Sequence, residues 1–376
     1  MTFFDKLFAG DKSLFDKPVV EQKVYLKKMG QANSDYERSY KQYKGQMFFM
    51  SWEKKCFLTL TSALIWPFLF FFLIIRGIIL RRGNKIEAIA RAKERDQFIP
   101  SSLMSEYQID RNSWWEVSAA LCSRDIFFAM WVCLYFWHSP YLALKTTFKL
   151  AKYSALIYRH QPKVIIVHDE FSFTSSVLTK FCALHNVTHI NVMHGEKLFS
   201  LRDSYFRFDY CYVWDDHYKR LFLQLNAAPD QFVIELPESM KFDIKSHYSN
   251  EYYADFKYYL GFYNEVEIAS IVKHMGSVIR KGKTVKFRPH PNYSDMKLLR
   301  KYVKDEQIEL PEVNILESIS STQNIVGVYS TVLTQAYFNG LNVILDDMSE
   351  KKQYESLKDL EYILIDKVSE RLSDYQ

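Results

Sequence analysis

Residues 164–194, VIIVHDEFSFTSSVLTKFCALHNVTHINVMH, contain two short β-rich runs separated by a longer helical pattern. An order of strand, helix and strand predicts a parallel sheet covered by helices. The alternation reaches YCYVW at 210–214 and restarts after residue 237. In the second half we expect strands at 258–262, 284–291, 324–330 and 342–347, and helices at 265–282 and 331–340. The fold class is therefore α/β.

Composition divides the chain into four segments. They are a polar segment at 1–55, a helical region at 56–160, and two α/β domains at 161–240 and 241–376. We expect the two domains to be Rossmann-like and to face each other across a cleft. In the helical region, IEAIARAKER at 86–95 has the spacing of an amphipathic helix.

An apolar run at 56–75 holds twenty residues without a charge, which is enough to just cross a bilayer. Basic residues flank both of its ends, so the positive-inside rule gives no orientation, and Pro67 would kink a helix. A single span, a re-entrant helix and an interfacial helix all fit, and a buried core helix is the alternative. A second apolar run at 126–137 is too short to span.

The charge balance excludes one class of partner. A net charge of +5, from 49 basic and 44 acidic residues, is too slight to indicate nucleic-acid binding. The five cysteines lack metal-binding spacing and suit a reducing cytoplasm. The first twelve residues do not have the pattern of a secretion signal. We expect a protein on the cytoplasmic face of the cell membrane.

Two loops of the first α/β domain follow predicted strands, where ligands bind in open α/β sheets. Asp169 and Glu170 come after the strand at 164–167, and either carboxylate could be a general base or a helix cap. His194 follows the next strand and precedes Gly195, which lets the backbone turn tightly. Its imidazole could act as a base or steady a departing phosphate.

Two loops of the second domain carry groups suited to phosphate. Arg288 and His290 stand in the sequence RPHP, whose prolines stiffen the loop and present two cationic donors. Ser330 and Thr331 lie where a strand meets a helix, so they can cap the helix and bind phosphate with the same geometry.

Several motifs are absent. The sequence has no GxxxxGK[ST], GxGxxG, GxSxG or HExxH motif and no Asp-x-Asp pair for a divalent metal. The classes that lose support are ATPases, dehydrogenases, serine hydrolases and zinc proteases. We expect no bound metal and no cofactor.

The RPHP loop, the later YST before a helix and the upstream His-Gly together resemble bacterial GT-B-type transferases of capsule and lipopolysaccharide synthesis. That group includes sialyltransferases and polysialyltransferases, Kdo transferases and CDP-glycerol glycerophosphotransferases. The resemblance covers residues 162–347. It implies a GT-B-like fold, a CMP- or CDP-linked donor and catalysis without metal.

By this resemblance, His290 contacts the donor phosphate, assisted by Ser330 and Thr331. The sialyltransferase motif of two acids and a glycine is matched only in part, because Phe171 follows Asp169 and Glu170. His194 resembles the base of the glycerophosphotransferases. The base is therefore open between Asp169 and His194.

The expected function is that of a glycosyltransferase of bacterial surface polysaccharide. The donor would be a CMP-activated sugar such as sialic acid, and the acceptor a glycan or lipid-linked glycan at the membrane. The first α/β domain would bind the acceptor and the second the donor. The alternatives are a CDP-glycerol or CDP-ribitol phosphotransferase, and a non-catalytic membrane-bound partner of a polysaccharide synthesis complex.

Overall fold

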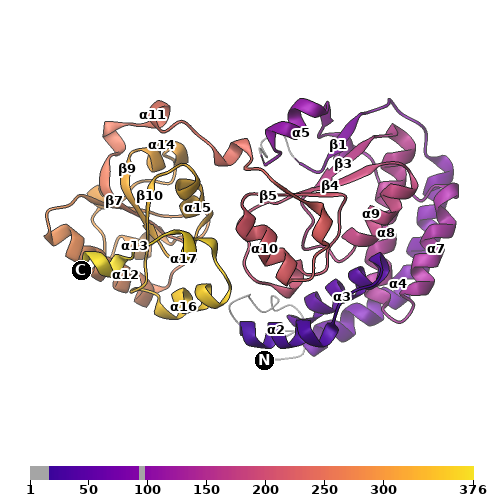
Figure 1. Cartoon of the computed structure of the whole chain (residues 1–376), viewed down its shortest axis with the longest axis horizontal. Helices are drawn as coiled ribbons and strands as arrows, with labels where there is room; N and C mark the ends of the chain where they lie inside the picture. The colour runs from indigo at the N-terminus through magenta and orange to yellow at the C-terminus, as the bar shows by residue number, and fades with distance from the viewer. Residues whose placement is uncertain (1–16, 93–97) are drawn as a thin grey trace. The chain divides into compact units, whose positions relative to one another are not determined.

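The computed structural model describes residues 17–92 and 98–376, which form two compact α/β units (Figure 1). The N-terminal unit extends to Pro237, except for the short loop Gly195–Leu198. This loop belongs with Glu238–Gln376 to the C-terminal unit. The prediction of two α/β domains is confirmed. Their arrangement across a cleft stays a prediction.

The N-terminal unit contains a six-stranded, entirely parallel sheet in the order β2-β1-β3-β4-β5-β6. The strands expected in 164–194 and at 210–214 are confirmed as β3, β4 and β5. All four residues of β3 are buried, as expected of a parallel strand that is covered on both faces. The strand bounds are β1 Ala88–Ala90, β2 Ile109–Asp110, β3 Val164–Val167, β4 Thr188–Val192, β5 Tyr210–Val213 and β6 Phe232–Ile234.

The helix predicted at 86–95 is wrong. Ala88–Ala90 is the strand β1, paired with residues 164–166 of β3, and residues 93–95 lie outside the described residues. Alanine favours helix and three residues are too few to show an alternation, so pairing with β2 and β3, and not local propensity, makes this segment extended. The sheet thus draws its first two strands from the region that was expected to be helical.

Helices build outward from one face of this sheet in successive layers (Figure 1). α9 (Ser175–Leu184) packs on β4, and α8 (Pro140–His160) packs on α9. The outermost helices, α4 (Trp52–Ile79) and α7 (Ile126–Tyr135), both pack on α8. The remaining helices of four residues or more in this unit are α2 Val19–Met29, α3 Asp35–Phe48, α5 Ser101–Glu106, α6 Ser113–Glu116 and α10 Asp216–Gln224.

The apolar run lies within α4, a continuous helix of 28 residues that is long and apolar enough to cross a membrane. Only 11% of its most apolar window is buried, so it is not the core helix of the alternative interpretation. The exposed apolar side chains of α4 include Leu60, Leu64, Phe68, Phe71, Ile75 and Ile78, and those of α7 include Phe127, Trp131 and Leu134. Membrane attachment itself stays a prediction.

The described part of the polar segment at 1–55 belongs to the N-terminal unit. Within it, α3 packs on α9, and the Gln42 side chain donates a 2.7 Å hydrogen bond to the backbone carbonyl of Glu170. The Tyr205 hydroxyl donates to the carbonyl of Gly30 at 2.6 Å. Residues 17–48 therefore brace the sheet and its loops, whereas residues 1–16 lie outside the described residues.

The C-terminal unit contains a four-stranded parallel sheet in the order β10-β9-β7-β8. All the strands and helices expected after residue 237 are confirmed, with shifts of a few residues at their ends. The strands are β7 Ala254–Tyr259, β8 Val285–Arg288, β9 Thr322–Gly327 and β10 Asn342–Leu345. The helices are α11 Ile244–His247, α12 Glu265–Arg280, α13 Met296–Leu299, α14 Ile315–Ser320, α15 Thr331–Phe338, α16 Lys351–Asp359 and α17 Ile363–Lys367.

Candidate functional site

A pocket of about 320 Å³ opens at the carboxyl ends of β7, β8 and β9 in the C-terminal unit. This edge is where ligands bind in open parallel sheets. Three of the predicted donor-binding residues, Arg288, His290 and Ser330, line it together. The other lining residues are Tyr259, Leu260, Pro289, Pro291, Pro311, Val313, Ile315 and Val332.

His290 is half-buried, and its loop fixes which ring nitrogen carries the proton. The backbone N–H of Asn292 donates to Nδ1 of His290 at 3.1 Å, and the ring stacks on Tyr293 with centroids 4.4 Å apart. Burial lowers the pKa of His290 below its ordinary value, so the ring is neutral at pH 7. Because Nδ1 accepts the hydrogen bond from Asn292, the proton of the neutral ring lies on Nε2. Without a bound anion, the ring is therefore a neutral hydrogen-bond donor at this position.

Arg288 lines the pocket, but its guanidinium is already engaged. Nη1 donates to Glu309 at 2.6 Å, and Nη2 donates to the carbonyl of Val313 at 2.7 Å. The same carboxylate accepts from Lys257, a fully buried lysine, at 2.5 Å. Burial raises the pKa of Glu309, and Lys257 with its other partners lowers it by more, so Glu309 is an anion. These contacts fasten the 309–313 wall to the sheet, and direct donor binding by Arg288 stays a prediction.

Ser330 and Thr331 differ in position. Ser330 is the N-cap of α15, and its hydroxyl accepts from the backbone N–H of Val332 at 3.2 Å. Thr331 is exposed and is not among the pocket-lining residues. The start of α15 nevertheless offers backbone N–H groups and the positive end of the helix dipole to an anion in the pocket.

Asp169 lies at the carboxyl end of β3 in the N-terminal unit and is almost fully buried, with 2% of its surface exposed. Its carboxylate forms ion pairs with Lys149, at 2.5 Å, and with Arg91. Burial raises the pKa of Asp169, and these two cations lower it by more, so its pKa lies below the ordinary value. A carboxylate held in this way is a weak proton acceptor, and its role as base stays a prediction.

Glu170 is also buried, with 1% of its surface exposed. Its carboxylate accepts from the side-chain amide of Asn191 at 3.2 Å, and the Oδ1 atom of Asn191 accepts from the backbone N–H of Asp169 at 2.7 Å. Asn191 of β4 thus ties the loop after β3 to the neighbouring strand. This geometry gives Glu170 a positioning role, and its catalytic role stays a prediction.

His194 follows β4 and is exposed at the same edge of the sheet. Its ring lies 5.5 Å from that of His168 and 5.1 Å from that of Phe98, measured between centroids. Gly195 takes a φ of +75°, a conformation that glycine adopts freely, as the His-Gly pair predicted. Of the three predicted catalytic side chains, His194 alone is exposed to solvent.

Three residues of this edge were missed from sequence. His168 directly follows β3, so the rule that selected Asp169 could have selected it; burial and the nearby charge of Arg91 lower its pKa. Arg91 follows β1, the strand that was mistaken for a helix. Lys149 lies in α8, and only the folded chain brings it to Asp169. Among the described residues, no three His, Cys, Asp or Glu side chains gather as metal ligands.

No protein-family model and no curated protein matches the sequence. The structure is similar to solved structures at low identity. UDP-GlcNAc 2-epimerase from Neisseria meningitidis bound to UDP-GlcNAc is 11% identical, with a TM-score of 0.41, over 72% of this chain and 85% of that chain. The S. aureus MnaA-UDP co-structure is 11% identical, with a TM-score of 0.41, over 75% of this chain and 88% of that chain. The lipopolysaccharide outer core galactosyltransferase WaaB in its apo form is 11% identical, with a TM-score of 0.37, over 70% of this chain and 81% of that chain. Likenesses at such TM-scores assign no activity to this chain.

Proposed function

We propose that the protein is a glycosyltransferase of bacterial surface polysaccharide synthesis, which binds a nucleotide-activated sugar in the pocket of the C-terminal unit. One observation carries this proposal: the RPHP loop and the cap of α15 line one pocket at the carboxyl ends of parallel strands. The Nε2–H of His290 is a donor that suits a phosphate, and the positive N-terminal end of the α15 dipole favours an anion beside it. Such donors stabilise the charge that develops on a departing nucleotide.

The charges around the pocket favour a donor with one phosphate. His290 is neutral, and Glu309 already neutralises one of the two cations that it contacts, Arg288 and Lys257. A CMP-linked sugar carries a single phosphate charge, whereas UDP- and CDP-linked donors carry two. We therefore keep the CMP-linked sugar as the proposed donor, although two of the similar structures contain UDP or UDP-GlcNAc.

The His290→Ala variant tests the donor pocket. Removing a hydrogen bond to a charged phosphate should weaken donor binding about 10- to 100-fold. Binding of CMP-sialic acid, UDP-GlcNAc and CDP-glycerol is measured by calorimetry for wild type and variant, with release of the free nucleotide as the readout of turnover. His274→Ala is the control, because this histidine of α12 does not line the pocket. Wild-type donor affinity in His290→Ala would remove the pocket from the proposal.

A CDP-glycerol or CDP-ribitol phosphotransferase is the second candidate function. It is favoured by the exposed His194 in a His-Gly pair, which resembles the base of those enzymes. Tight binding and turnover of CDP-glycerol, without either for CMP-sialic acid, would select it. Donor binding without turnover of any donor would instead select the non-catalytic partner.

We further propose that α4 attaches the protein to the cytoplasmic face of the membrane, as a span or in the interface. Its apolar side chains are exposed over most of its length, and α7 adds Phe127, Trp131 and Leu134 to the outer helices of the unit. Exposing such a surface to water is unfavourable, so we expect the full-length protein in the membrane fraction, released by detergent. Recovery in the soluble fraction without detergent would contradict the attachment.

A further inference from the structure

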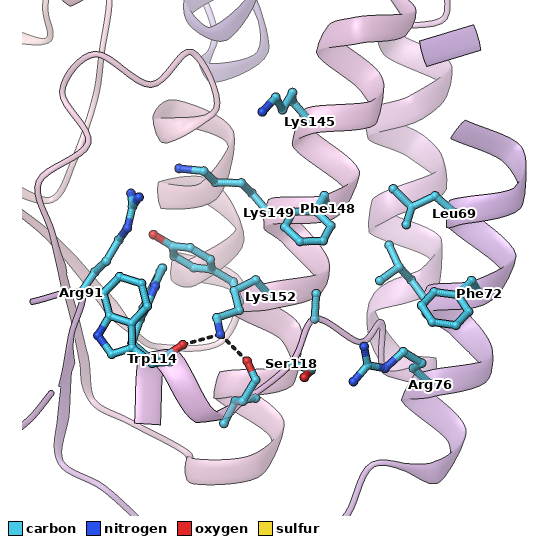
Figure 2. Close-up of a pocket in the computed structure, with 15 residues that line it drawn as sticks. Leu69, Phe72, Arg76, Arg91, Trp114, Ser118, Lys145, Phe148, Lys149 and Lys152 are labelled. Carbon is cyan, nitrogen blue, oxygen red and sulfur yellow. Dashed lines mark hydrogen bonds between the residues drawn. The ribbon is translucent and has the colours of Figure 1, made fainter. Parts of the chain in front are cut away.

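A second pocket, of about 510 Å³, lies in the N-terminal unit between α8, α4 and the segment at 114–119 (Figure 2). Five basic side chains line it: Arg76, Arg91, Lys145, Lys149 and Lys152. No acidic side chain is among its lining residues in the described part of the chain. The function proposed above makes no use of this pocket.

The three lysines share one face of α8, at spacings of four and three residues (Figure 2). Like charges at this spacing destabilise a helix unless something compensates them. Asp169 compensates Lys149 and Arg91 in part, since one carboxylate accepts from both cations. Within residues 17–92 and 98–376, Lys145 and Arg76 have no ion pair. The pocket therefore keeps an excess of positive charge.

Lys152 is held differently from its two neighbours. Its ammonium donates to the backbone carbonyls of Trp114 and Val117, and burial lowers its pKa to about 8. It remains mostly charged at pH 7 and is half-buried. Because its hydrogen bonds go to neutral carbonyls, a bound anion would stabilise its charge.

Apolar side chains form the other wall of the pocket. Leu69 and Phe72 of α4 line the pocket on the α4 side (Figure 2), and Phe72 remains 54% exposed. Phe148 of α8 and Trp115 are also half exposed. The wall is continuous with the rest of α4, the helix that is apolar enough to cross a membrane. A ligand that satisfies both walls has an anionic head and a hydrocarbon chain.

We infer that this pocket binds the phosphate or pyrophosphate head of a lipid, with the hydrocarbon chain along Leu69 and Phe72. Phosphate oxygens suit several cations at once, and the pocket lies within the size range of small-molecule sites. Such a lipid is either the carrier of a lipid-linked acceptor or a membrane phospholipid. The carrier assignment rests on the proposed function, whereas binding of a lipid phosphate does not.

The test uses the full-length protein in detergent micelles. Binding is measured by calorimetry for a polyprenyl phosphate, the uncharged polyprenol of the same length, phosphatidylglycerol and inorganic pyrophosphate. We expect a lipid phosphate to bind and the polyprenol not to bind. The double variant Arg76→Gln/Lys145→Gln, which removes the two cations without an ion pair, should bind the lipid at least about tenfold more weakly.

The control is Lys85→Gln/Lys219→Gln, which removes the same charge from the same unit outside the pocket. It should bind like wild type. Preference for polyprenyl phosphate identifies an acceptor carrier, and preference for phosphatidylglycerol identifies a membrane lipid. Equal binding of polyprenol and its phosphate, pyrophosphate binding as tight as that of the lipid, or an unaffected pocket variant would each overturn the inference.

Donor binding separates this inference from the proposed function. The donor pocket lies in the C-terminal unit, so the Arg76→Gln/Lys145→Gln variant should bind nucleotide sugar like wild type. If the lipid phosphate binds and no donor does, the function fails and the lipid site stands. If the donor binds and no lipid phosphate does, the lipid site fails and the donor pocket stands.

Discussion

The Glu309→Ala variant is expected to lose roughly 3 to 5 kcal/mol of stability in the C-terminal unit and to lose donor binding with it. Within the described residues, Glu309 alone forms ion pairs with both Lys257 and Arg288, at 2.5 and 2.6 Å. The Lys257 side chain is fully buried, and that of Arg288 is nearly so. Without Glu309, two charges remain in the core with no counterion. The 309–313 wall of the pocket would then detach from the sheet.

Hydrogen exchange can measure this loss in the C-terminal unit alone. Tryptophan fluorescence would report poorly on it, because all the tryptophans lie in the N-terminal part of the chain. Amides of β7, β8 and β9 should lose protection, while those of β3 and β4 should keep it. Asp305→Ala is the matched control, since its ion pair with Arg300 is exposed and worth about 1 kcal/mol or less. Equal protection of β7 to β9 in wild type and Glu309→Ala would show that the network does not hold the unit together.

The sequence was most informative where apolar runs were long and regular. VIIV at 164–167 and the run at 324–330 gave β3 and β9, and the cap Ser330 marked the start of α15. The donor pocket followed from one further rule, that loops after parallel strands meet at one edge of a sheet. Arg288, His290 and Ser330 do line one pocket. These features depend on the local sequence pattern and on the order of strands and helices along the chain.

What the sequence did not show depends on contacts between distant residues. Arg288 could be placed near the pocket, but the sequence did not show that its guanidinium is already bonded to Glu309, which lies 21 residues away. The ion pairs of Asp169 were hidden in the same way, because Lys149 comes from α8 and Arg91 follows a strand only three residues long. Whether a charged side chain is free or paired is a property of packing, and sequence spacing does not reveal it.

The His194→Ala variant is expected to lower turnover by about 10²- to 10⁴-fold while leaving donor binding and folding unchanged. General base catalysis needs a group that an acceptor hydroxyl can reach. His194 is exposed at the carboxyl edge of the sheet, whereas Asp169 and Glu170 are buried and bonded to other side chains. Because the side chain of His194 is exposed, with ring contacts to Phe98 and His168, its truncation should cost little stability.

The comparison variants separate a base from a structural residue. Asp169→Asn should lower stability first, because Lys149 and Arg91 lose the charge that pairs them, and its activity should fall in step with the folded fraction. His138→Ala removes another exposed histidine of the same unit and should leave turnover unchanged. Turnover is measured at saturating donor and acceptor, with unfolding followed on the same samples. A folded His194→Ala variant with wild-type turnover, beside a folded Asp169→Asn variant without activity, would return the base to Asp169.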